Sequence, residues 1–424
     1  MGFGSSESGQ AEIIVIGDEV ISGLIVDTNS KYLAQRIFEL GLSVSCITKI
    51  GDNFSVIEDE IEKALQRSDW IILTGGLGGT HDDITKSVVT KVFGSNLRQD
   101  EKVETMLKEI FRKRNREIPE SVKSQSQVPD NCQVFYNEMG TAPGFRFERN
   151  EHALFCLPGV PHEMKNLFEQ YIVPELKERS TQAFCQRILK TTGISEASLW
   201  ETVGPLDELQ KKATIASLPS HLGVRIRISC LEKNKDKGEA KLDEVEQSLR
   251  ESIDKYIYGK DEECLEAKVG ELLMEKSMTL ATAESCTGGL IGHRLTQISG
   301  SSNYYKEGFV VYSNEAKVSR LGVEEKKLEA HGAVSEPVAR AMAKGVCKVT
   351  GADIGVSVTG IAGPTGGTPE KPVGLTFIAV SDGENTWCRK YIYTHDRIKN
   401  KERVAQTALN LVRMKLLGLL TEEN

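Results

Sequence analysis

Short apolar runs and amphipathic helical segments alternate along the first part of the chain, from Ala11 to about Glu178. Short apolar runs predict strands, and apolar residues spaced three and four apart predict helices. The predicted elements are, in order, strand 12–16, helix 28–40, strand 42–50, helix 55–66 and strand 70–73. This regular alternation indicates βαβ units and a mainly parallel sheet.

The alternation stops between residues 184 and 260, where residues 223–231 predict a strand and residues 239–256 a charged helix. We interpret the charge run at 233–241 as a solvated turn that enters this helix. The pattern then resumes with helix 265–274, a strand near Leu280, helix 290–298, strand 308–312, helix 336–349, strands 354–358, 373–380 and 386–393, and helix 399–419.

The predicted fold class is therefore α/β, with two three-layer domains that have mainly parallel sheets. We place these domains at residues 11–180 and 261–424 and a small α+β insert at residues 181–260. Residues 1–10 are rich in glycine and serine and are interpreted as a disordered leader. A chain of 424 residues exceeds what one hydrophobic core usually supports, which agrees with several domains.

Composition narrows the functional classes. Charged residues make up 27% of the chain and the net charge is −8, which disfavours a general affinity for nucleic acid or for an anionic membrane. No apolar run approaches the roughly 18 residues of a spanning helix, and the N-terminus lacks the order of a signal peptide. The nine cysteines are scattered without a C-x-x-C pair, which indicates reduced thiols. We expect a cytoplasmic protein.

The pairing of Ser285 with Lys317 suggests a hydrolase. Ser285 follows an apolar run and precedes a helical pattern, so helix N–H groups should lie nearby to hold developing negative charge. No Ser-His-Asp order is evident, but a lysine with a lowered pKa can act as the base, and Tyr312 could relay or orient the proton. The structural alternatives are Ser285 as an N-cap, Lys317 as an exposed helix residue and Tyr312 as packing. Cys286 is a rival nucleophile.

A glycine-rich segment at 359–374 follows another apolar strand. Its glycines offer N–H groups to a phosphate, and Thr359 could hydrogen-bond to a substrate. Arg397 and Arg403 open the last helix and could pair with a phosphate or a carboxylate, although solvated arginines are common at helix starts.

A second candidate site follows strand 70–73, in the glycine run at 75–79 and the residues after it. Ligands in open α/β sheets gather at the carboxyl ends of strands. Glycines let N–H groups approach a phosphate, and Asp82 and Asp83 could hold a hard cation such as Mg²⁺. The alternative is a tight turn in which one of these aspartates caps the next helix.

Three other segments, at 17–19, 140–144 and 157–164, also fall in predicted connections. We expect them to form one pocket together with this glycine run. Asp18, Glu19 and Glu163 would add carboxylates to it, although each alone is more often a surface or capping residue. His81 and His162 lack tight metal-ligand spacing, so zinc is not expected.

Together these motifs resemble the full-length form of the CinA family, the competence-damage-inducible proteins, over residues 11–419. The N-terminal motifs, which include Gly75-Gly76-Leu77-Gly78 and Asp82-Asp83, are similar to a molybdopterin-binding-type domain. In that family this domain is implicated in metal-dependent ADP-ribose pyrophosphatase activity. The middle segment resembles the KH-like insert of the family but has no G-x-x-G loop in a basic setting, so RNA binding is not expected.

The C-terminal motifs at 284–289, 312–317 and 360–367 are similar to nicotinamide-nucleotide amidases, which convert nicotinamide mononucleotide to nicotinic acid mononucleotide and ammonia. The resemblance implies Ser285 as the nucleophile, Lys317 as the base, Tyr312 and Thr359 as helpers, and Arg397 or Arg403 as a substrate contact. The further substrate-binding positions that it implies are Gly288, Gly289, Asn314, Gly360, Gly363, Gly366 and Gly367.

The resemblance also implies an N-terminal nucleotide site that uses a divalent metal (Mg, Mn or Co) on Asp82 and Asp83, whereas the amidase needs no cofactor. The residues implied for that site are Asp18, Glu19, Asn29, Gly75, Gly76, Gly78, Thr80, Thr141, Gly159 and Glu163. One departure is Gly79, which stands where the family usually has proline and gives a looser loop.

The family is dimeric, so a homodimer is expected. The expected ligands are the small nucleotides nicotinamide mononucleotide and ADP-ribose, with no membrane and no general nucleic-acid binding. Two other hypotheses stay open. The first is a non-catalytic pterin- or nucleotide-binding protein linked to competence and DNA uptake, and the second is an amidase whose N-terminal half is structural.

Overall fold

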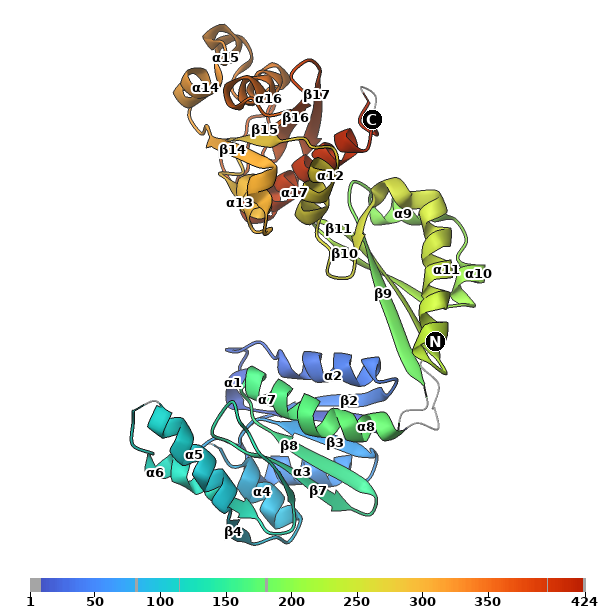
Figure 1. Ribbon diagram of the computed structural model, residues 1–424, viewed down its shortest axis with the longest axis vertical. Helices are drawn as coiled ribbons and strands as arrows, with labels where there is room; N and C mark the ends of the chain where they lie inside the picture. The colour runs from blue at the N-terminus through green and yellow to red at the C-terminus, as the bar shows by residue number, and fades with distance from the viewer. Residues whose placement is uncertain (1–8, 81–82, 114, 180–181, 395, 422–424) are drawn as a thin grey trace. The chain divides into compact units, whose positions relative to one another are not determined.

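The structure, a computed structural model, describes residues 9–80, 83–113, 115–179, 182–394 and 396–421. It is an α/β protein with three main sheets, as the hydrophobic pattern predicts (Figure 1). The chain forms two compact units: Met1–Cys185 with Cys230–Ala240, and Gln186–Ser229 with Lys241–Asn424. The domain boundaries near residues 180 and 260 stay predictions.

The N-terminal sheet has six strands in the order β2-β1-β3-β8-β7-β6. The first three pairings are parallel, and β7 and β6 extend the sheet by antiparallel pairing. The strands are β1 (Gln10–Ile16), β2 (Ser43–Ile50), β3 (Trp70–Thr74), β6 (Gln133–Phe135), β7 (Gly144–Arg149) and β8 (His152–Leu157), with a separate ribbon of β4 (Leu97–Gln99) and β5 (Gln127–Pro129).

Helices cover both faces of this sheet (Figure 1). Alternate residues of β1 point to opposite faces, so Ile14 packs against α3, α4 and α5, while Ile13 packs against α2, α7 and α8. This is the three-layer arrangement that was predicted. The helices are α1 (Asp18–Ile21), α2 (Asn29–Glu39), α3 (Phe54–Ala64), α4 (Thr85–Val92), α5 (Glu101–Lys113), α6 (Glu120–Lys123), α7 (Pro161–Leu167) and α8 (Val173–Arg179).

The middle segment is an α+β structure with a four-stranded sheet in the order β10-β11-β9-β12. The β10·β11 and β9·β12 pairs are antiparallel. Its elements are β9 (Ala183–Thr191), α9 (Glu196–Val203), α10 (Asp207–Gln210), β10 (Thr214–Ser220), β11 (Gly223–Glu232), α11 (Lys235–Ile253) and β12 (Ile257–Lys260). The charge run at 233–241 was interpreted as a turn, but α11 begins at Lys235, so most of the run forms the first turns of the helix.

The C-terminal sheet has the order β14-β13-β15-β16-β17, in which β13 pairs in parallel with β14 and β15, and β16 and β17 are added by antiparallel pairing. The strands are β13 (Leu280–Glu284), β14 (Tyr305–Val310), β15 (Ile354–Gly360), β16 (Leu375–Ser381) and β17 (Thr386–Ile392). The helices are α12 (Leu265–Glu275), α13 (Leu290–Thr296), α14 (Asn314–Leu321), α15 (Glu325–His331), α16 (Glu336–Thr350) and α17 (Arg397–Leu416).

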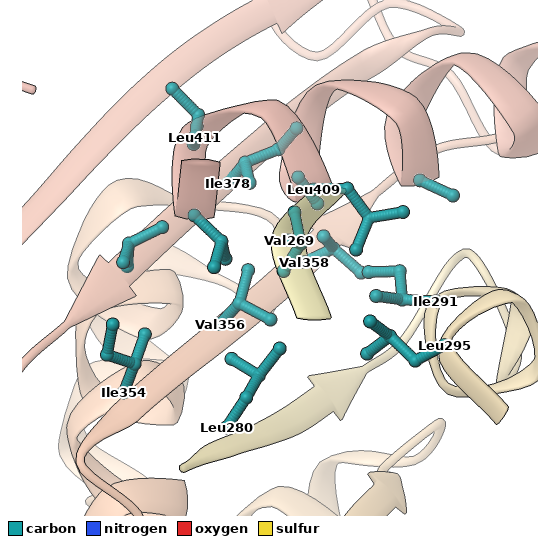
Figure 2. Packing of buried hydrophobic residues seen from close by; sticks show 14 of the residues in the cluster. Val269, Leu280, Ile291, Leu295, Ile354, Val356, Val358, Ile378, Leu409 and Leu411 are labelled. Atoms are coloured by element: carbon teal, nitrogen blue, oxygen red, sulfur yellow. The ribbon is translucent and has the colours of Figure 1, made fainter. Parts of the chain in front are cut away.

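Two hydrophobic layers hold this sheet. On one face, Leu280 of β13 and Val356 of β15 meet side chains of α12, α13 and α17, such as Leu409 (Figure 2). On the other face, Ala281 and Ala283 of β13 pack against α14 and α16. The polar ends of the parallel strands therefore emerge between two helical layers, where connecting loops can hold a site.

Most predicted elements lie within a few residues of the observed ones. One strand was misplaced: residues 308–312 were predicted, whereas β14 spans Tyr305–Val310, so Tyr312 lies in the loop after it. The two antiparallel strands at the end of the C-terminal sheet were predicted as strands, but their direction was not. In the described part of the chain, none of the helices is long and apolar enough to cross a membrane.

Candidate active site

Ser285 lies directly after β13, where that strand gives way to the turn before α13. The residue is 8% exposed, and its backbone N–H donates to Val358 O of β15 at 3.1 Å. Two glycines in left-handed conformation, Gly288 at φ 64° and Gly289 at φ 94°, then turn the chain into the helix. The strand–turn–helix setting predicted for this serine is present.

Lys317 is a buried residue of α14, 1% exposed, and not the exposed helix residue of the structural alternative. Its Nζ lies 3.4 Å from Ser285 Oγ. It also donates to three successive carbonyls: Val311 at 2.9 Å, Tyr312 at 3.2 Å and Ser313 at 3.4 Å. Burial lowers the pKa of the Lys317 ammonium, because a charged group is costly away from water. An amine that loses its proton more readily than usual therefore faces a serine hydroxyl.

Glu284 occupies the N–H groups at the start of α13. Its buried carboxylate accepts hydrogen bonds from Ile291 N at 3.1 Å and from Gly292 N at 2.9 Å. We expected N–H groups at the start of this helix to hold negative charge that develops near Ser285. That expectation is wrong for Ile291 N and Gly292 N, because both already donate to Glu284. Sequence reasoning missed this cap, although a carboxylate just before a helical pattern is a known capping signal.

The Cys286 side chain belongs to the hydrophobic core beneath the site and is 6% exposed. Burial raises the pKa of its thiol to about 12. Because the thiolate is the nucleophilic form of cysteine, this thiol is protonated and unreactive at neutral pH. The geometry therefore counts against the rival nucleophile.

Tyr312 contacts the site through two different atoms. Its carbonyl accepts from Lys317, whereas its phenol oxygen lies 3.3 Å from Arg397 Nη2 and its side chain is largely exposed. Among the described residues, the phenol is thus joined to Arg397 and not to the lysine. The proton relay expected for Tyr312 is not formed in this arrangement.

The two candidate arginines differ in their contacts. Arg397 Nη1 also donates to Gly363 O at 2.8 Å, so its guanidinium ties the start of α17 to the glycine-rich loop. The guanidinium of Arg403 lies over the Tyr393 ring, 5.4 Å from the ring centroid. Of the two, Arg397 is the one that the structure brings to the loop and to Tyr312.

The glycine-rich loop, residues 361–374, connects β15 to β16. Thr359 is buried near its start and donates its hydroxyl to Ala333 O at 2.8 Å, so this hydroxyl is directed at a neighbouring loop. A Cβ at Gly363 would lie 2.5 Å from Val373 Cγ1, which explains the need for glycine there. The other predicted positions are Gly360 at the end of β15, Gly366 and Gly367 exposed in the loop, and Asn314 exposed at the start of α14.

Two residues of α17 near this loop were missed from the sequence. Asn400 is buried and donates from Nδ2 to Ala362 O at 3.1 Å, which holds the first turn of the helix against the loop. Lys401 reaches the turn at Gly288: a Cβ placed on that glycine would lie 3.7 Å from Lys401 Nζ. Polar residues in a first helical turn are ordinary, so the sequence carried no signal for either contact.

In the N-terminal sheet, the predicted segments follow parallel strands that end at one edge. Asp18 and Glu19 follow β1, the glycine run follows β3, and Gly159 follows β8. Gly75 N donates to Leu157 O at 3.1 Å, and a Cβ on Gly159 would lie 3.4 Å from Gly75 Cα. The close backbone approach explains why glycine occupies these positions.

Asn29 joins three of these connections. Its Nδ2 donates to Thr74 Oγ1 at 3.0 Å and to Gly159 O at 2.8 Å, and the Thr74 hydroxyl donates to Pro158 O at 2.9 Å. Asn29 Oδ1 is buried and has no hydrogen-bond partner among the residues that the structure describes. The amide therefore keeps a free acceptor at this edge.

Glu163 lies beside the connection at 140–144, as expected. Its carboxylate accepts from Asn137 Nδ2 at 2.6 Å and packs on Gly140, where a Cβ would overlap it. Sequence reasoning missed Asn137, a buried residue with no motif around it. Thr141 lines a cavity of about 10 Å³ with Asn137 and Gly140, which is too small for a nucleotide.

Asp83 caps its own loop: its Oδ2 accepts from Thr80 N at 2.8 Å and from the Thr80 hydroxyl. The turn of the structural alternative is therefore present, but the helix cap is not: the N-cap of α4 is Ile84, and no side chain caps that helix. Gly76 and Gly78 leave room for Thr85 and Asp83. Asp82, the other carboxylate predicted to bind the metal, lies outside the described residues.

Gly79, the departure from the family motif, packs against α6. A Cβ there would lie 2.5 Å from Ser121 O, so the backbone of α6 fills the space that a proline ring would need. A glycine in place of the usual proline therefore fits the close packing of this loop against α6.

Asp52, which follows β2, is a further carboxylate at this edge that was missed. Asp18 N donates to Asp52 Oδ2 at 2.9 Å, and Asp52 N donates to Asp18 Oδ1 at 3.2 Å. Burial raises the pKa of the Asp52 carboxyl, and the charges of Asp18, Glu19 and Asp83 raise it further. Even so, in the ranges that the structure covers, no group of three or more His, Cys, Asp or Glu residues is arranged to hold a metal ion.

Comparison with known proteins gives three matching family models. They are "Probable molybdopterin binding domain" at residues 12–178, "Damage-inducible protein CinA KH domain" at residues 186–259 and "CinA C-terminal domain" at residues 262–416. The three matched ranges follow one another along the chain in the same order as the N-terminal, middle and C-terminal sheets.

Similar proteins extend over nearly the whole chain. A CinA-like protein of Chloroherpeton thalassium is 42% identical over 412 residues, which cover 95% of this chain and 98% of the relative. A CinA-like protein of Salinibacter ruber is 41% identical over 410 residues, which cover 96% and 99%.

Among solved structures, the competence/damage inducible protein CihA of Agrobacterium tumefaciens is 39% identical. The match covers 36% of this chain and 93% of that one, with a TM-score of 0.35. The near full-length identity to the relatives and the three family models give the assignment: this chain belongs to the CinA family, with a molybdopterin-binding-like domain, a CinA KH domain and a CinA C-terminal domain.

Proposed function

We propose that the C-terminal domain is an amidase that hydrolyses the carboxamide of nicotinamide mononucleotide to a carboxylate and ammonia. The observation that carries this proposal is the buried Lys317 Nζ, 3.4 Å from the hydroxyl of Ser285 at the end of a parallel strand. Such a distance is within the loose range of catalytic hydrogen bonds before substrate binds.

In the proposed reaction, the neutral amine of Lys317 accepts the Ser285 hydroxyl proton while Oγ attacks the carboxamide carbon. The C–N bond then breaks, and the leaving nitrogen takes the proton back from Lys317 and departs as ammonia. Water, deprotonated by the same lysine, adds to the acyl-enzyme and releases the carboxylic acid and the serine hydroxyl. Protons and bonds balance without a metal or a redox cofactor.

The test is ammonia release from nicotinamide mononucleotide by the purified full-length protein. We expect Ser285→Ala to lower kcat by at least about a thousandfold, because the covalent intermediate is lost. Cys286→Ser, the matched control, should stay within a few-fold of the parent. Parental rates in Ser285→Ala would refute the nucleophile. Tight nucleotide binding by the parent without turnover would instead favour a non-catalytic binding protein.

A second candidate function, metal-dependent cleavage of ADP-ribose, concerns the N-terminal domain. The observation in its favour is the contact between Asp18 and Asp52, in which each carboxylate accepts from the other residue's backbone N–H. The pKa of the Asp52 carboxyl is raised mainly by burial and further by the charges of Asp18, Glu19 and Asp83. A divalent cation would offset the like charges of these neighbouring carboxylates, and oxygen ligands suit Mg²⁺ or Mn²⁺. Such a cation would draw electron density from the pyrophosphate oxygens.

The second function is tested by ADP-ribose hydrolysis with added Mg²⁺, Mn²⁺ or Co²⁺. We expect activity that chelator abolishes and that Asp83→Asn weakens, with Asp59→Asn on the exposed side of α3 as the control. Activity in chelator, or an unchanged rate in Asp83→Asn, would reject it. Ammonia release alone, with no ADP-ribose cleavage, would indicate that the N-terminal half is structural.

A further inference from the structure

The glycine-rich loop at 361–374 is tied to a helix near each of its ends. Near its beginning, Arg397 and Asn400 of α17 donate hydrogen bonds to its backbone carbonyls at 2.8 and 3.1 Å. Near its end, Lys371 Nζ donates at 2.6 Å to the carbonyl of His331, the last residue of α15. The loop therefore runs between α17 and α15.

The contact of Lys371 is prepared on both sides. Gly332, which follows α15 at φ 71°, leaves room for the ammonium, because a Cβ there would lie 3.0 Å from Lys371 Nζ. In the loop, Thr368 N donates to Lys371 O at 2.9 Å, and Lys371 N donates to Thr368 Oγ1 at 3.0 Å. A cation is also favourable at the C-terminus of a helix, where the last carbonyls lack partners within the helix.

The two ties differ in how easily they open. At the α17 end, Asn400 is 1% exposed, and the Arg397 guanidinium makes a second hydrogen bond, to Tyr312. At the α15 end, the donor is the side chain of a half-buried lysine, and residues 364–370 between the ties are all exposed. Water can replace both partners of such a contact, so the loop opens more easily from α15 than from α17.

The loop begins beside the candidate nucleophile. Ser285 N donates to Val358 O, and the loop starts three residues later, directly after β15. The Thr359 hydroxyl holds Ala333 O, two residues after the end of α15, so this helix end is fixed next to β15. The helix that carries Lys317, α14, leads into α15. The contact with α15 therefore joins the loop to the part of the domain that supplies the candidate base.

We infer that Lys371 is a positioning residue: its hydrogen bond to His331 keeps the glycine-rich loop closed beside Ser285 while a nucleotide is bound, and the breaking of that bond sets the rate at which the product leaves. This inference rests on the proposed amidase function. Loops that close over a substrate exclude water, and their opening limits turnover in many enzymes. Lys371 acts through the loop and does not itself contact the nucleotide.

The first experiment measures product release from the full-length protein. Bound nicotinic acid mononucleotide is diluted into an excess of unlabelled product, and its dissociation rate is recorded. We expect Lys371→Met to raise this rate at least about fivefold, whereas Lys371→Arg, which keeps a charged donor, stays within about twofold of the parent. Lys348→Met, which removes an exposed cation of α16, should not change it. Ammonia release in a single turnover should change less than about twofold in Lys371→Met, because the serine and the base remain.

A second experiment reports the loop itself and needs no turnover. Glutamyl endopeptidase cleaves after Glu370, an exposed residue next to Lys371. Bound nicotinic acid mononucleotide should slow this cleavage in the parent and in Lys371→Arg, as followed by mass spectrometry. The protection should be lost in Lys371→Met.

Unchanged product dissociation in Lys371→Met, or an equal rise in Lys348→Met, would overturn the inference. A lower single-turnover rate with unchanged dissociation would indicate a structural contact only and would overturn it as well. Failure of the two proposals can be told apart. If bound nucleotide protects Glu370 through Lys371 but the parent releases no ammonia, the closure stands and the amidase function fails. If the parent deamidates the mononucleotide and Lys371→Met releases product at the parental rate, the amidase stands and the closure fails.

Discussion

Replacing Lys317 by methionine tests the chemistry at the centre of the site. Methionine keeps the length and the apolar stem of lysine but has no amine, so the general base is lost. General bases contribute about 10² to 10⁴ in rate, which is about 3 to 5 kcal/mol of transition-state stabilisation. We therefore expect kcat for ammonia release from nicotinamide mononucleotide to fall by two to four orders of magnitude in Lys317→Met.

The fold should survive this change. The carbonyls of Val311, Tyr312 and Ser313 each lose a donor, which costs about 1 kcal/mol apiece. The penalty for burying an ammonium is removed at the same time, so the net loss is below about 3 kcal/mol. Thermal unfolding measures this loss, and Lys326→Met on the exposed face of α15 is the matched control.

The pH dependence gives a sharper form of the same prediction. Because burial lowers the folded-state pKa of Lys317 below its unfolded value, the unfolded chain binds this proton more readily between the two values. Stability contributed by Lys317 therefore rises with pH across that window, and kcat/KM rises as the amine loses its proton. Both rises should disappear in Lys317→Met. A variant that keeps the parental rate, or a parental rate that falls as the amine deprotonates, would refute the assignment of Lys317 as the base.

Two further predictions concern packing around the two sites. Glu284→Gln should lower the free energy of unfolding by about 1 to 3 kcal/mol, because the buried carboxylate that accepts from Ile291 N and Gly292 N loses its charge. Urea denaturation measures this loss, with Glu307→Gln in the exposed part of β14 as the control, and equal stability of the two variants would contradict the cap. Gly79→Ala should cost about 1 to 3 kcal/mol, because its Cβ would lie 2.5 Å from Ser121 O; unchanged urea denaturation would show that α6 moves away easily.

The α/β class and most elements follow from periodicity, because each strand and helix buries a face whose spacing is visible in the sequence. The strand at 308–312 was misplaced for a physical reason. Its apolar residues continue past Val310, but the carbonyls of Val311, Tyr312 and Ser313 turn toward Lys317 and leave the ladder. A contact with a residue of the next helix decided where the strand ends, and no local pattern reports that.

The candidate site was predicted only in part, because local patterns do not report contacts between residues that are distant in sequence. Motifs placed Ser285 after a strand, and the structure has it there, because a strand end is a local feature. No pattern in the sequence showed that Lys317 is buried; its burial was only a requirement of the proposed role as a base. Asp52 and Lys401 were missed altogether, because each is an ordinary polar residue in the sequence. Asp52 is marked out only by its hydrogen bond to Asp18, and Lys401 only by the position of its Nζ near the turn at Gly288.

The two candidate sites differ in charge, and this difference bears on how each would treat an anionic nucleotide. At the C-terminal site, the start of α17 places Arg397 and Lys401 beside the loops near Ser285, so an anionic nucleotide meets cations that the chain itself supplies. The N-terminal edge instead gathers Asp18 and Asp52, whose carboxylates repel one another and would repel a pyrophosphate. We therefore expect the first site to bind its nucleotide without added metal, with an affinity that falls as salt is raised. We expect the second to bind a pyrophosphate only when a divalent cation has first reversed the local charge.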